Sequence, residues 1–229
     1  MVEEQNRFIV IEGLDGSGKS TQIDLLLNFL REGNIPFEYL HFPRTDEGFF
    51  GEMVARFLRG DLGPLDSVHP YLVAMIYAGN RYDSRDLIRD WLDKGMHVIV
   101  DRYVVSNIAF QCAKLGTEKE QKELREWIVD FEYNYYGIPR PDVNVFLDVP
   151  FNFTTRKLTS DREGNDREYL NGKVDIHEQD LDFQRKVREV YLELSSSDQN
   201  VHILDCSDDQ GEMLAPENIF AKLRTLLFD

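Results

Sequence analysis

A glycine-rich stretch near the amino terminus has residue types and a spacing that suit phosphate chemistry. It reads G-L-D-G-S-G-K-S over residues 13–20 and matches the pattern G-x-x-x-x-G-K-[ST]. Glycines in this pattern let consecutive backbone N–H groups face inward at a helix N-terminus, whose positive dipole end favours an anion. Lys19 would reach the β- and γ-phosphates of a nucleotide, and Ser20 would offer a hydroxyl to Mg²⁺. The stretch therefore predicts a P-loop, with Asp15 facing the group that receives the phosphoryl unit.

The segments on either side of the loop support this interpretation. An apolar run of strand length, residues 8–11, comes before it, and residues 21–31 follow with a helical pattern. In that pattern the apolar positions fall at i, i+3, i+4 and i+7, as on one face of an amphipathic helix. A glycine-rich turn without a function is the alternative, but strand, loop and helix follow one another in the order that a P-loop requires.

Composition limits the classes of protein and partner. With 229 residues and 42% hydrophobic content, the chain can bury one substantial core, so we expect a single domain over residues 1–229. The net charge of -16 would repel nucleic acids and anionic membranes, so neither is expected as a partner, and a nucleotide must bind at a local cationic site. Cys112 and Cys206 lack metal-ligand spacing. With no signal-peptide pattern and no long apolar run, we expect a cytoplasmic protein.

The rest of the chain alternates between strand and helix patterns. This alternation predicts an α/β fold, a doubly wound parallel sheet of about five strands flanked by helices, with ligands bound beyond the carboxyl ends of the strands. Asp101 closes an apolar strand at that edge, where a carboxylate can become the second partner of the metal. The predicted strands after the P-loop cover residues 37–42, 97–100, 143–148 and 201–204, and the predicted helices cover residues 50–58, 70–94, 104–115 and 117–136, with two more beginning near His177 and at Pro216.

Two further regions bear on the site. The loops after the predicted strands, residues 43–44, residues 101–102 and the loop after Asp205, should meet the P-loop at one crevice. From Thr154 the helical periodicity disappears, and basic and acidic residues alternate. This composition is typical of a mobile charged segment, so we predict a lid over about residues 154–176.

In this order and spacing, the motifs resemble those of the thymidylate kinases, P-loop enzymes that phosphorylate dTMP with ATP. The resemblance covers nearly the whole chain. It implies a P-loop kinase fold and in-line transfer of the γ-phosphoryl group of ATP to dTMP, giving dTDP for dTTP synthesis, with Mg²⁺ and without a protein general base. It also implies a homodimer, for which the apolar faces around residues 49–58 and 72–77 could serve. The residues that carry it are 8–22, Phe42, Pro43, Arg44, Asn80, Arg81, Asp101, Arg102, Tyr103, Ser106, Asn107, Phe110, Arg162 and Arg167.

The resemblance assigns roles on the acceptor side. Asp15 would hold the 3′-hydroxyl of dTMP, and Arg44 and Arg102 would grip its phosphate as planar, bidentate donors. Structural alternatives are a local turn bond for Asp15 and ordinary ion pairs for the arginines. The remaining acceptor residues would be Phe42, Tyr77 stacked on thymine, Arg81 on a base carbonyl, Ser106 and Asn107 on the pyrimidine edge, and Phe110 near the 2′ position. Core packing is the alternative for Tyr77 and Phe110.

The resemblance also assigns the ATP side. Arg156 would lie against adenine, helped by residues 206–210, with a solvated surface charge as the alternative. Some members of the family carry an arginine where this chain has Gly16, and others supply cations from the lid. Gly16 places this chain with the second group, so we predict that Arg167, or else Arg162, closes over the phosphates. The residues expected to bind ATP in the P-loop are Gly13, Leu14, Asp15, Gly16, Ser17, Gly18, Lys19, Ser20 and Thr21.

Three other functions compete with this interpretation. A P-loop kinase for another nucleoside monophosphate, or for a deoxynucleoside, would keep the fold and change the acceptor; Ser106, Asn107 and Arg81 favour a pyrimidine with a carbonyl. A GTPase-like switch is disfavoured because the guanine-reading motif N-K-x-D does not occur in the sequence. A binding protein without catalysis is disfavoured because Lys19, Ser20 and Asp101 are all present.

Overall fold

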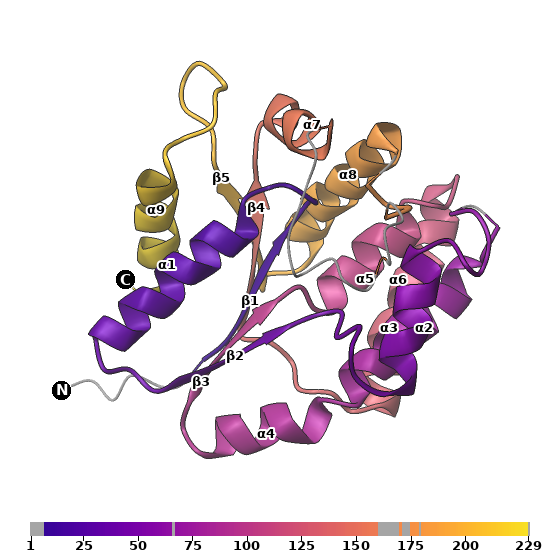
Figure 1. Cartoon of the computed structure of the whole chain (residues 1–229), viewed down its shortest axis with the longest axis horizontal. Helices are drawn as coiled ribbons and strands as arrows, with labels where there is room; N and C mark the ends of the chain where they lie inside the picture. Colours follow the sequence, from indigo (N-terminus) through magenta and orange to yellow (C-terminus); the bar gives the residue numbers. More distant parts are fainter. Residues whose placement is uncertain (1–6, 66, 160–169, 171–174, 179, 229) are drawn as a thin grey trace.

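A parallel sheet forms the centre of the computed structural model, which describes residues 7–65, 67–159, 170, 175–178 and 180–228. Within these residues the sheet has five strands in the order β2-β3-β1-β4-β5 (Figure 1). Neighbours that are not consecutive in the sequence require crossover connections, which the helices provide. The strands are β1 (Phe8–Gly13), β2 (Phe37–His41), β3 (His97–Asp101), β4 (Val143–Asp148) and β5 (Val201–Asp205).

Helices cover both faces of this sheet, as the alternating pattern predicts. α1 and α9 lie on one face, and α2, α3, α5, α6 and α8 lie on the other (Figure 1). Each face has its own apolar core, with Leu26, Leu30 and Leu223 in the first and Val104, Ile108 and Tyr191 in the second. The α-helices of the described residues are α1 (Lys19–Glu32), α2 (Gly48–Leu58), α3 (Pro70–Tyr82), α4 (Arg85–Asp93), α5 (Val104–Cys112), α6 (Glu118–Val129), α7 (Phe151–Thr159), α8 (Leu181–Ser197) and α9 (Pro216–Phe228).

The register of the central strands places the functional loops side by side. Every residue of β1 and β3 is buried, as expected for strands with helices on both faces. Ile11 pairs with Asp101, and Gly13 pairs with Leu147 on the other side of β1. The start of the P-loop and the carboxylate that ends β3 therefore emerge at the same edge of the sheet.

The predicted helix over residues 70–94 is wrong as a single element. The structure ends α3 at Tyr82 and begins α4 at Arg85. At the break, the backbone N–H of Ser84 bonds to the carbonyl of Arg81, an i to i−3 bond that tightens the last turn. The break contains Asp83 and Ser84. Asp and Ser favour helix ends over helix interiors because their side chains form hydrogen bonds with backbone groups in place of the helical hydrogen bonds. The break lets α3 line the site while α4 leads into β3 at the opposite end of the molecule (Figure 1).

Three other predicted boundaries also differ from the structure. The helix predicted to end near residue 136 is α6 as far as Val129, followed by a π-helix over Asp130–Tyr135. The loss of periodicity predicted from Thr154 begins later, because α7 continues to Thr159 and packs Phe153 against the apolar core beneath it. The helix predicted from about His177 begins at Leu181, where Asp180 caps it by accepting the N–H of Phe183 at 2.9 Å.

Cys112 and Cys206 are free and buried, and burial raises the pKa of each thiol to about 12, so both stay protonated near neutral pH. Among the described residues, no helix combines the length and the apolar character needed to cross a bilayer.

Candidate active site

A cavity of about 1460 Å³ opens at the carboxyl ends of the central strands. The P-loop, the loops after β2 and β3, and the helices α3 and α5 all contribute to its wall. The structure thus brings most of the predicted site residues around one space, as expected for a sheet of this topology. The predicted residues that line it are Asp15, Gly16, Ser17, Gly18, Lys19, Ser20, Thr21, Phe42, Arg44, Tyr77, Arg81, Asp101, Arg102, Ser106, Asn107 and Phe110.

The P-loop is preorganised around its lysine. Gly18 adopts a φ of 82° at the start of α1, a left-handed conformation that glycine takes without strain. The Nζ of Lys19 bonds to the carbonyl oxygens of Gly13 at 3.3 Å and Leu14 at 3.1 Å. No acidic residue lies in the first turn of α1, so the helix dipole is not neutralised there. Burial, assisted by Arg102, lowers the pKa of Lys19 to about 8.

Asp15 is held from two sides. Its Oδ1 accepts from Nη2 of Arg102 at 2.7 Å, and its Oδ2 accepts from Nε2 of Gln184 on α8 at 3.0 Å. Burial acts to raise the pKa of this carboxyl, but the charges of Arg102 and Lys19 outweigh it and lower the pKa to about 2. Asp15 is therefore ionised at neutral pH. Gln184 is fully buried and was not among the predicted residues.

Arg102 takes its place through a constrained backbone. Its φ is 64°, a left-handed value that is uncommon outside glycine and that costs of the order of 1–3 kcal/mol. The start of α5 supports this turn, because the carboxylate of the buried Glu12 accepts the backbone N–H groups of Tyr103 at 3.0 Å and Ser106 at 3.2 Å. The hydroxyl of Ser106 bonds to Glu12, to Arg102 and to Tyr191. In this arrangement Ser106 supports Arg102; its predicted contact with a pyrimidine stays a prediction.

Asp101 carries a carboxylate oxygen that suits a hydrated cation. Its Oδ2 lies 3.2 Å from Nδ1 of His41, whereas its Oδ1 is buried without a hydrogen-bond partner among the described residues. Burial raises the pKa of Asp101, but His41 and Lys19 lower it by more. Across the described part of the chain, no group of three or more His, Cys, Asp or Glu side chains is arranged to hold a metal ion. One carboxylate and one hydroxyl nevertheless fit Mg²⁺, which keeps several waters and uses substrate phosphates as ligands.

Arg44 is fixed by its backbone more than by its side chain. The side chain of Asn80 on α3 accepts the N–H of Arg44 at 2.9 Å and donates to its carbonyl at 2.9 Å. The guanidinium bonds to Ser84 Oγ at 2.8 Å and forms an ion pair with Glu47. Arg44 lines the same cavity as the P-loop and could bind a second anion there.

The far end of the cavity is polar and buried. The guanidinium of Arg81 makes two bonds to the carboxylate of Glu132, at 2.5 and 2.6 Å. The Nδ2 of Asn107 donates to the carbonyl of Ala74 at 3.0 Å and to Glu132 at 2.9 Å. Burial acts to lower the pKa of Arg81, but its neighbours, led by Glu132, raise it, so the guanidinium stays charged.

Aromatic side chains form the wall between the two polar ends. Phe110 lies with its ring centroid 5.0 Å from that of His177 and under the guanidinium of Arg102 at 5.2 Å. Tyr77 contacts Phe57 edge to face at 6.5 Å. Burial lowers the pKa of His177 to about 3, so its imidazole is neutral at physiological pH. His177 lines the same cavity and was not predicted.

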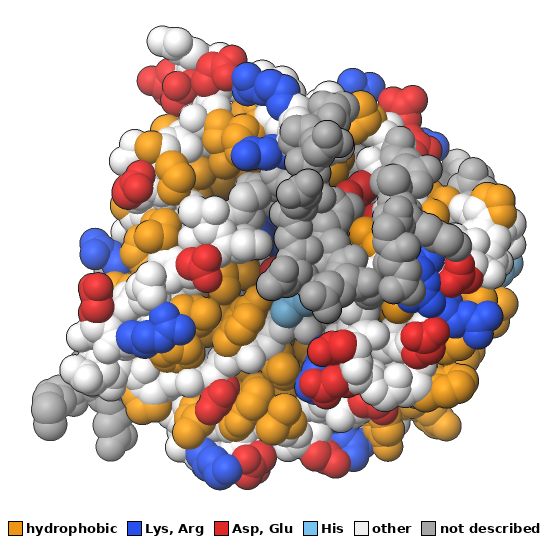
Figure 2. Space-filling model, viewed as in Figure 1, with side chains coloured by type: hydrophobic (Ala, Val, Ile, Leu, Met, Phe, Trp, Pro, Cys, Tyr) orange, Lys and Arg blue, Asp and Glu red, His pale blue; other side chains and the backbone are white. Residues whose placement is uncertain are grey.

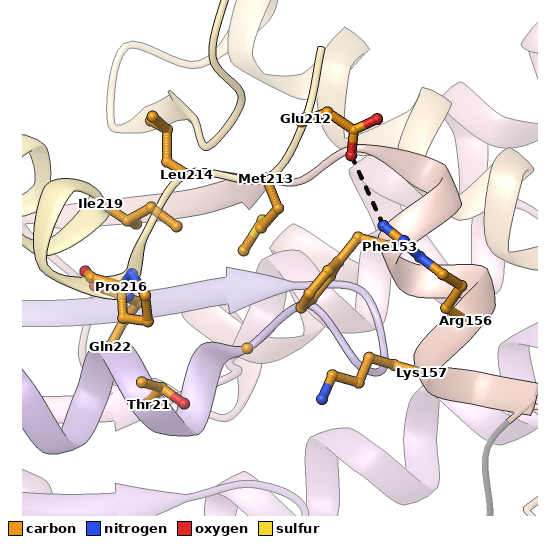
Figure 3. A pocket seen from close by; sticks show the side chains of 11 residues that line it. Thr21, Gln22, Phe153, Arg156, Lys157, Glu212, Met213, Leu214, Pro216 and Ile219 are labelled. Carbon is orange, nitrogen blue, oxygen red and sulfur yellow. Dashed lines mark hydrogen bonds and ion pairs between the residues drawn. The ribbon is translucent and has the colours of Figure 1, made fainter. Parts of the chain in front are cut away.

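A second, smaller cavity of about 630 Å³ lies beside the P-loop helix (Figure 3). Phe153 and Met213 point into it from α7 and from the loop before α9, and Thr21 lies at its floor (Figure 3). Arg156 also lines it and lies 3.9 Å from Glu212. An apolar slot with a guanidinium at its edge suits a planar aromatic ring.

The predicted lid arginines and the buried partners of the site residues remain to be placed. Arg162 and Arg167, the predicted lid cations, lie outside the described residues. Glu12 and Asn80 were named with the motifs but given no role, and Glu132 and Gln184 were not predicted; all four hold predicted site residues in place. A signal existed for Glu132, because it falls four positions after Ile128 on the apolar face of a predicted helix, where a charge requires a partner.

Comparisons with known proteins show similarity to thymidylate kinases. The family model described as thymidylate kinase matches residues 11–215 of this chain. The chain is 30% identical to the thymidylate kinase of Schizosaccharomyces pombe over 224 residues, covering 98% of this chain and 99% of that protein. It is 28% identical to the thymidylate kinase of Plasmodium falciparum over 201 residues, covering 88% of this chain and 83% of that protein.

A solved structure supports the fold. The thymidylate kinase of Candida albicans superposes with a TM-score of 0.71 at 23% identity, and the match covers 97% of this chain and 91% of that one. The doubly wound P-loop arrangement predicted from the sequence is therefore confirmed, together with the similarity to this family.

Proposed function

The chain belongs to the thymidylate kinase family and phosphorylates dTMP with ATP, and we propose that it does so by in-line transfer between nucleotides bound at the two ends of the large cavity. An oxygen of the dTMP phosphate attacks the γ-phosphorus of ATP, and the bond from that phosphorus to the leaving ADP breaks. The attacking oxygen is already ionised near neutral pH, so no general base is needed. The protein contributes position, charge and exclusion of water.

On the donor side, we assign the ATP phosphates to the P-loop. The backbone N–H groups of residues 13–21 surround the phosphates, and Lys19 leaves its two carbonyl partners to bind the β- and γ-phosphates. Ser20 and Asp101 would hold Mg²⁺, which neutralises charge on the phosphates when it is bound. Adenine fits the smaller cavity beside Arg156.

On the acceptor side, Asp15 and Arg102 mark the position of the sugar and the phosphate. Asp15 accepts the 3′-hydroxyl, and Arg102 turns from Asp15 toward the phosphate that Arg44 also binds. Phe42, Tyr77 and Phe110 enclose the nucleotide. Arg81 and Asn107 bind the edge of the base, and Ser106, which lines the same cavity, is assigned to the same edge. The predicted lid cation, Arg167 or else Arg162, would complete the charge around the migrating phosphoryl group.

One observation carries this assignment. Lys19, Asp15 and Arg102 line one cavity that continues to the buried pair Arg81 and Asn107. Cations for two phosphate groups and polar groups for a base therefore border a single space. This is the layout that transfer between two nucleotides requires, because both phosphates must approach within bonding distance.

An acceptor panel tests the proposal. Purified protein with ATP and Mg²⁺ should convert dTMP to dTDP, and dCMP and purine monophosphates should react much more slowly. Arg81→Ala should weaken dTMP binding and leave the KM for ATP near the wild-type value. Rapid turnover of an acceptor other than a keto pyrimidine, with dTMP unreactive, would exclude the proposed acceptor end of the site.

Assembly and location belong to the same proposal. We propose a homodimer through the apolar surface of α2 and α3, where Phe49 and Leu72 are exposed. Acidic side chains are spread over the face shown in Figure 2, in line with the net charge of -16, and this charge supports a protein that binds neither nucleic acid nor anionic membranes. We further propose that residues 1–229 form one domain with its lid near residues 154–176, and that it acts in the cytoplasm.

A further inference from the structure

Glu132 is a fully buried carboxylate with a restricted set of partners. Its side chain is 0% exposed, and each of its described side-chain bonds goes to Arg81 or Asn107. Both partners line the large cavity, and Glu132 stands behind them. A carboxylate so placed acts on a ligand only through the two side chains that it holds.

Glu132 lies within a local irregularity of the backbone. The π-helix Asp130–Tyr135 follows α6, and the N–H of Tyr136 bonds to the carbonyl of Phe131 at 2.9 Å, five residues back. The wider turn shifts the register of the helix by one residue, and such turns occur frequently at functional sites. Asp130 and Asn134, in the same irregular turn, are exposed, whereas Glu132 between them is buried.

Stability alone is a weak reason for this ion pair. Removing two charges from water costs several kcal/mol per ion, and an apolar pair of similar volume is often as stable. Arg81 and Glu132 are 2% and 0% exposed, so the cost applies to both. A role in placing hydrogen-bonding atoms explains why charges are used here.

Glu132 fixes the orientation of the Asn107 amide. The two hydrogens of Nδ2 point to the carbonyl of Ala74 and to Oε1 of Glu132, which are both acceptors. The reverse orientation would place Oδ1 against two acceptors, so the Asn107 amide keeps this orientation as long as both oxygens of Glu132 act as acceptors. Oδ1 is consequently directed away from them, buried and without a partner among the described residues. Asn107 therefore presents an acceptor to the cavity.

Glu132 also selects which nitrogen of Arg81 can meet a ligand. Its two oxygens accept hydrogen bonds from Nε and Nη2, while Nη1 donates to none of the described residues. The guanidinium lies over the ring of Tyr103 at 5.9 Å, which further restricts its plane. Arg81 therefore keeps Nη1 as a donor that Glu132 does not occupy, and both Arg81 and Asn107 line the cavity.

We propose that Glu132 is a positioning residue that sets the polarity of base recognition, making this end of the cavity specific for a keto pyrimidine. A donor from Arg81 beside an acceptor from Asn107 complements the carbonyl O4 and the N3–H of thymine or uracil. Cytosine offers a donor and an acceptor in the opposite order, so both contacts would be lost. The inference rests on the proposed function, in which Arg81 and Asn107 read the base.

The test compares Glu132→Gln with the wild-type protein on dTMP, dUMP and dCMP. Glutamine has nearly the same shape but adds a donor, which allows the Asn107 amide to turn. We expect the KM for dTMP to rise and the ratio of kcat/KM for dTMP over dCMP to fall, each by about tenfold, as for the loss of one buried hydrogen bond. The KM for ATP should stay near its wild-type value. Glu132→Asp keeps two acceptor oxygens on a side chain one methylene shorter, so it should preserve the ratio and raise the KM for dTMP.

Asp130→Asn is the matched control, because it removes a carboxylate that is exposed on the same π-helix. It should leave all constants unchanged. The inference fails if Glu132→Gln keeps the wild-type ratio of kcat/KM for dTMP over dCMP. It also fails if kcat/KM falls by the same factor for ATP and for all acceptors. If Glu132→Gln does not fold, Glu132→Asp provides the test. A loss of the preference in kcat/KM for dTMP over dCMP, or an unchanged KM for dTMP, would then contradict the inference. A wild-type protein that does not prefer dTMP to dCMP would instead refute the proposed function.

Discussion

Asp15 shows how single side chains in this site are prepared before any ligand binds. Arg102 and Gln184 hold one oxygen each, and the nearby cations keep the carboxylate ionised. Gln184 also bonds to the carbonyl of His177, which ties the start of α8 to the P-loop. The residues with proposed roles in chemistry thus depend on buried partners that lie far away in the sequence.

The first prediction concerns Asp15→Asn. Loss of a charge-assisted hydrogen bond of about 1.5–3 kcal/mol should lower kcat/KM for dTMP by about 10- to 100-fold. Because the pKa of Asp15 is lowered to about 2, its ionised form persists above that pH and is lost only as the pH falls through about 2. The ratio between wild type and variant should therefore be constant from about pH 5.5 to 7, where Asp15 stays ionised, the substrate phosphate titrates with a pKa of about 6, and Lys19, with a pKa of about 8, stays protonated. A ratio that shrinks toward pH 5.5 would mean that Asp15 titrates in the working range.

The second prediction concerns the lid cations. If Arg167 stabilises the charge on the migrating phosphoryl group, Arg167→Ala should lower kcat by about 10³-fold, and Arg162→Ala should have a smaller effect. Lys186→Ala removes an exposed positive charge on α8 and serves as the control for net charge. Steady-state kinetics with saturating ATP and dTMP provide the measurement. Wild-type turnover in both arginine variants would show that the transition-state charge is neutralised elsewhere.

At the scale of helices, the contact between α2 and α3 sets one wall of the cavity. A Cβ at Gly79 would lie 2.4 Å from the ring of Phe50, so glycine allows the two helices to approach closely. The next residue, Asn80, holds the backbone of Arg44. Packing between these helices and the position of a proposed phosphate-binding residue are therefore linked.

The third prediction follows from this contact. Gly79→Ala should destabilise the protein by about 1–3 kcal/mol through overpacking, partly offset by the higher helix propensity of alanine, which is worth about 1 kcal/mol. Thermal unfolding should show a lower Tm. Gly116→Ala is the control, because no described atom beyond its two chain neighbours lies within 4 Å of the added Cβ. Equal melting temperatures for the two variants would show that Phe50 moves aside without cost.

At the scale of the whole molecule, hydrophobic side chains remain exposed on the helices proposed to form a dimer. Phe49 is 76% exposed and Leu72 is 55% exposed, on α2 and α3. Exposed apolar side chains that gather on one surface commonly mark an interface. Both helices also line the active-site cavity, so assembly would stabilise the wall that carries Tyr77 and Arg81.

The fourth prediction tests assembly. Leu72→Glu should place a charge in the interface and convert a dimer to a monomer, because unpaired charges are excluded from the centre of stable interfaces. Size-exclusion chromatography with light scattering gives the mass directly. Ile203→Glu, at an exposed hydrophobic position on β5, is the control and should not change the mass. A wild-type protein that is already monomeric at micromolar concentration would refute the proposed dimer.

The sequence by itself determined the parts of this protein that are encoded locally. The P-loop follows from a contiguous pattern, and the succession of strands and helices along the chain follows from alternating periodicities, because both depend on residues that are neighbours along the chain. Asp101 could be placed at the sheet edge for the same reason. The motifs also located the residues that line the cavity, although their roles stay predictions.

Tertiary structure alone decided how those residues are held. Glu132 reaches Arg81 across 51 positions, Gln184 reaches Asp15 across 169, and the guanidinium of Arg102 meets Asp15 across 87. The break between α3 and α4 and the π-helix after α6 also have weak local signals. Such pairings depend on which helix faces cross once the sheet has formed, and a burial pattern shows that a charge needs a partner without showing which partner it finds.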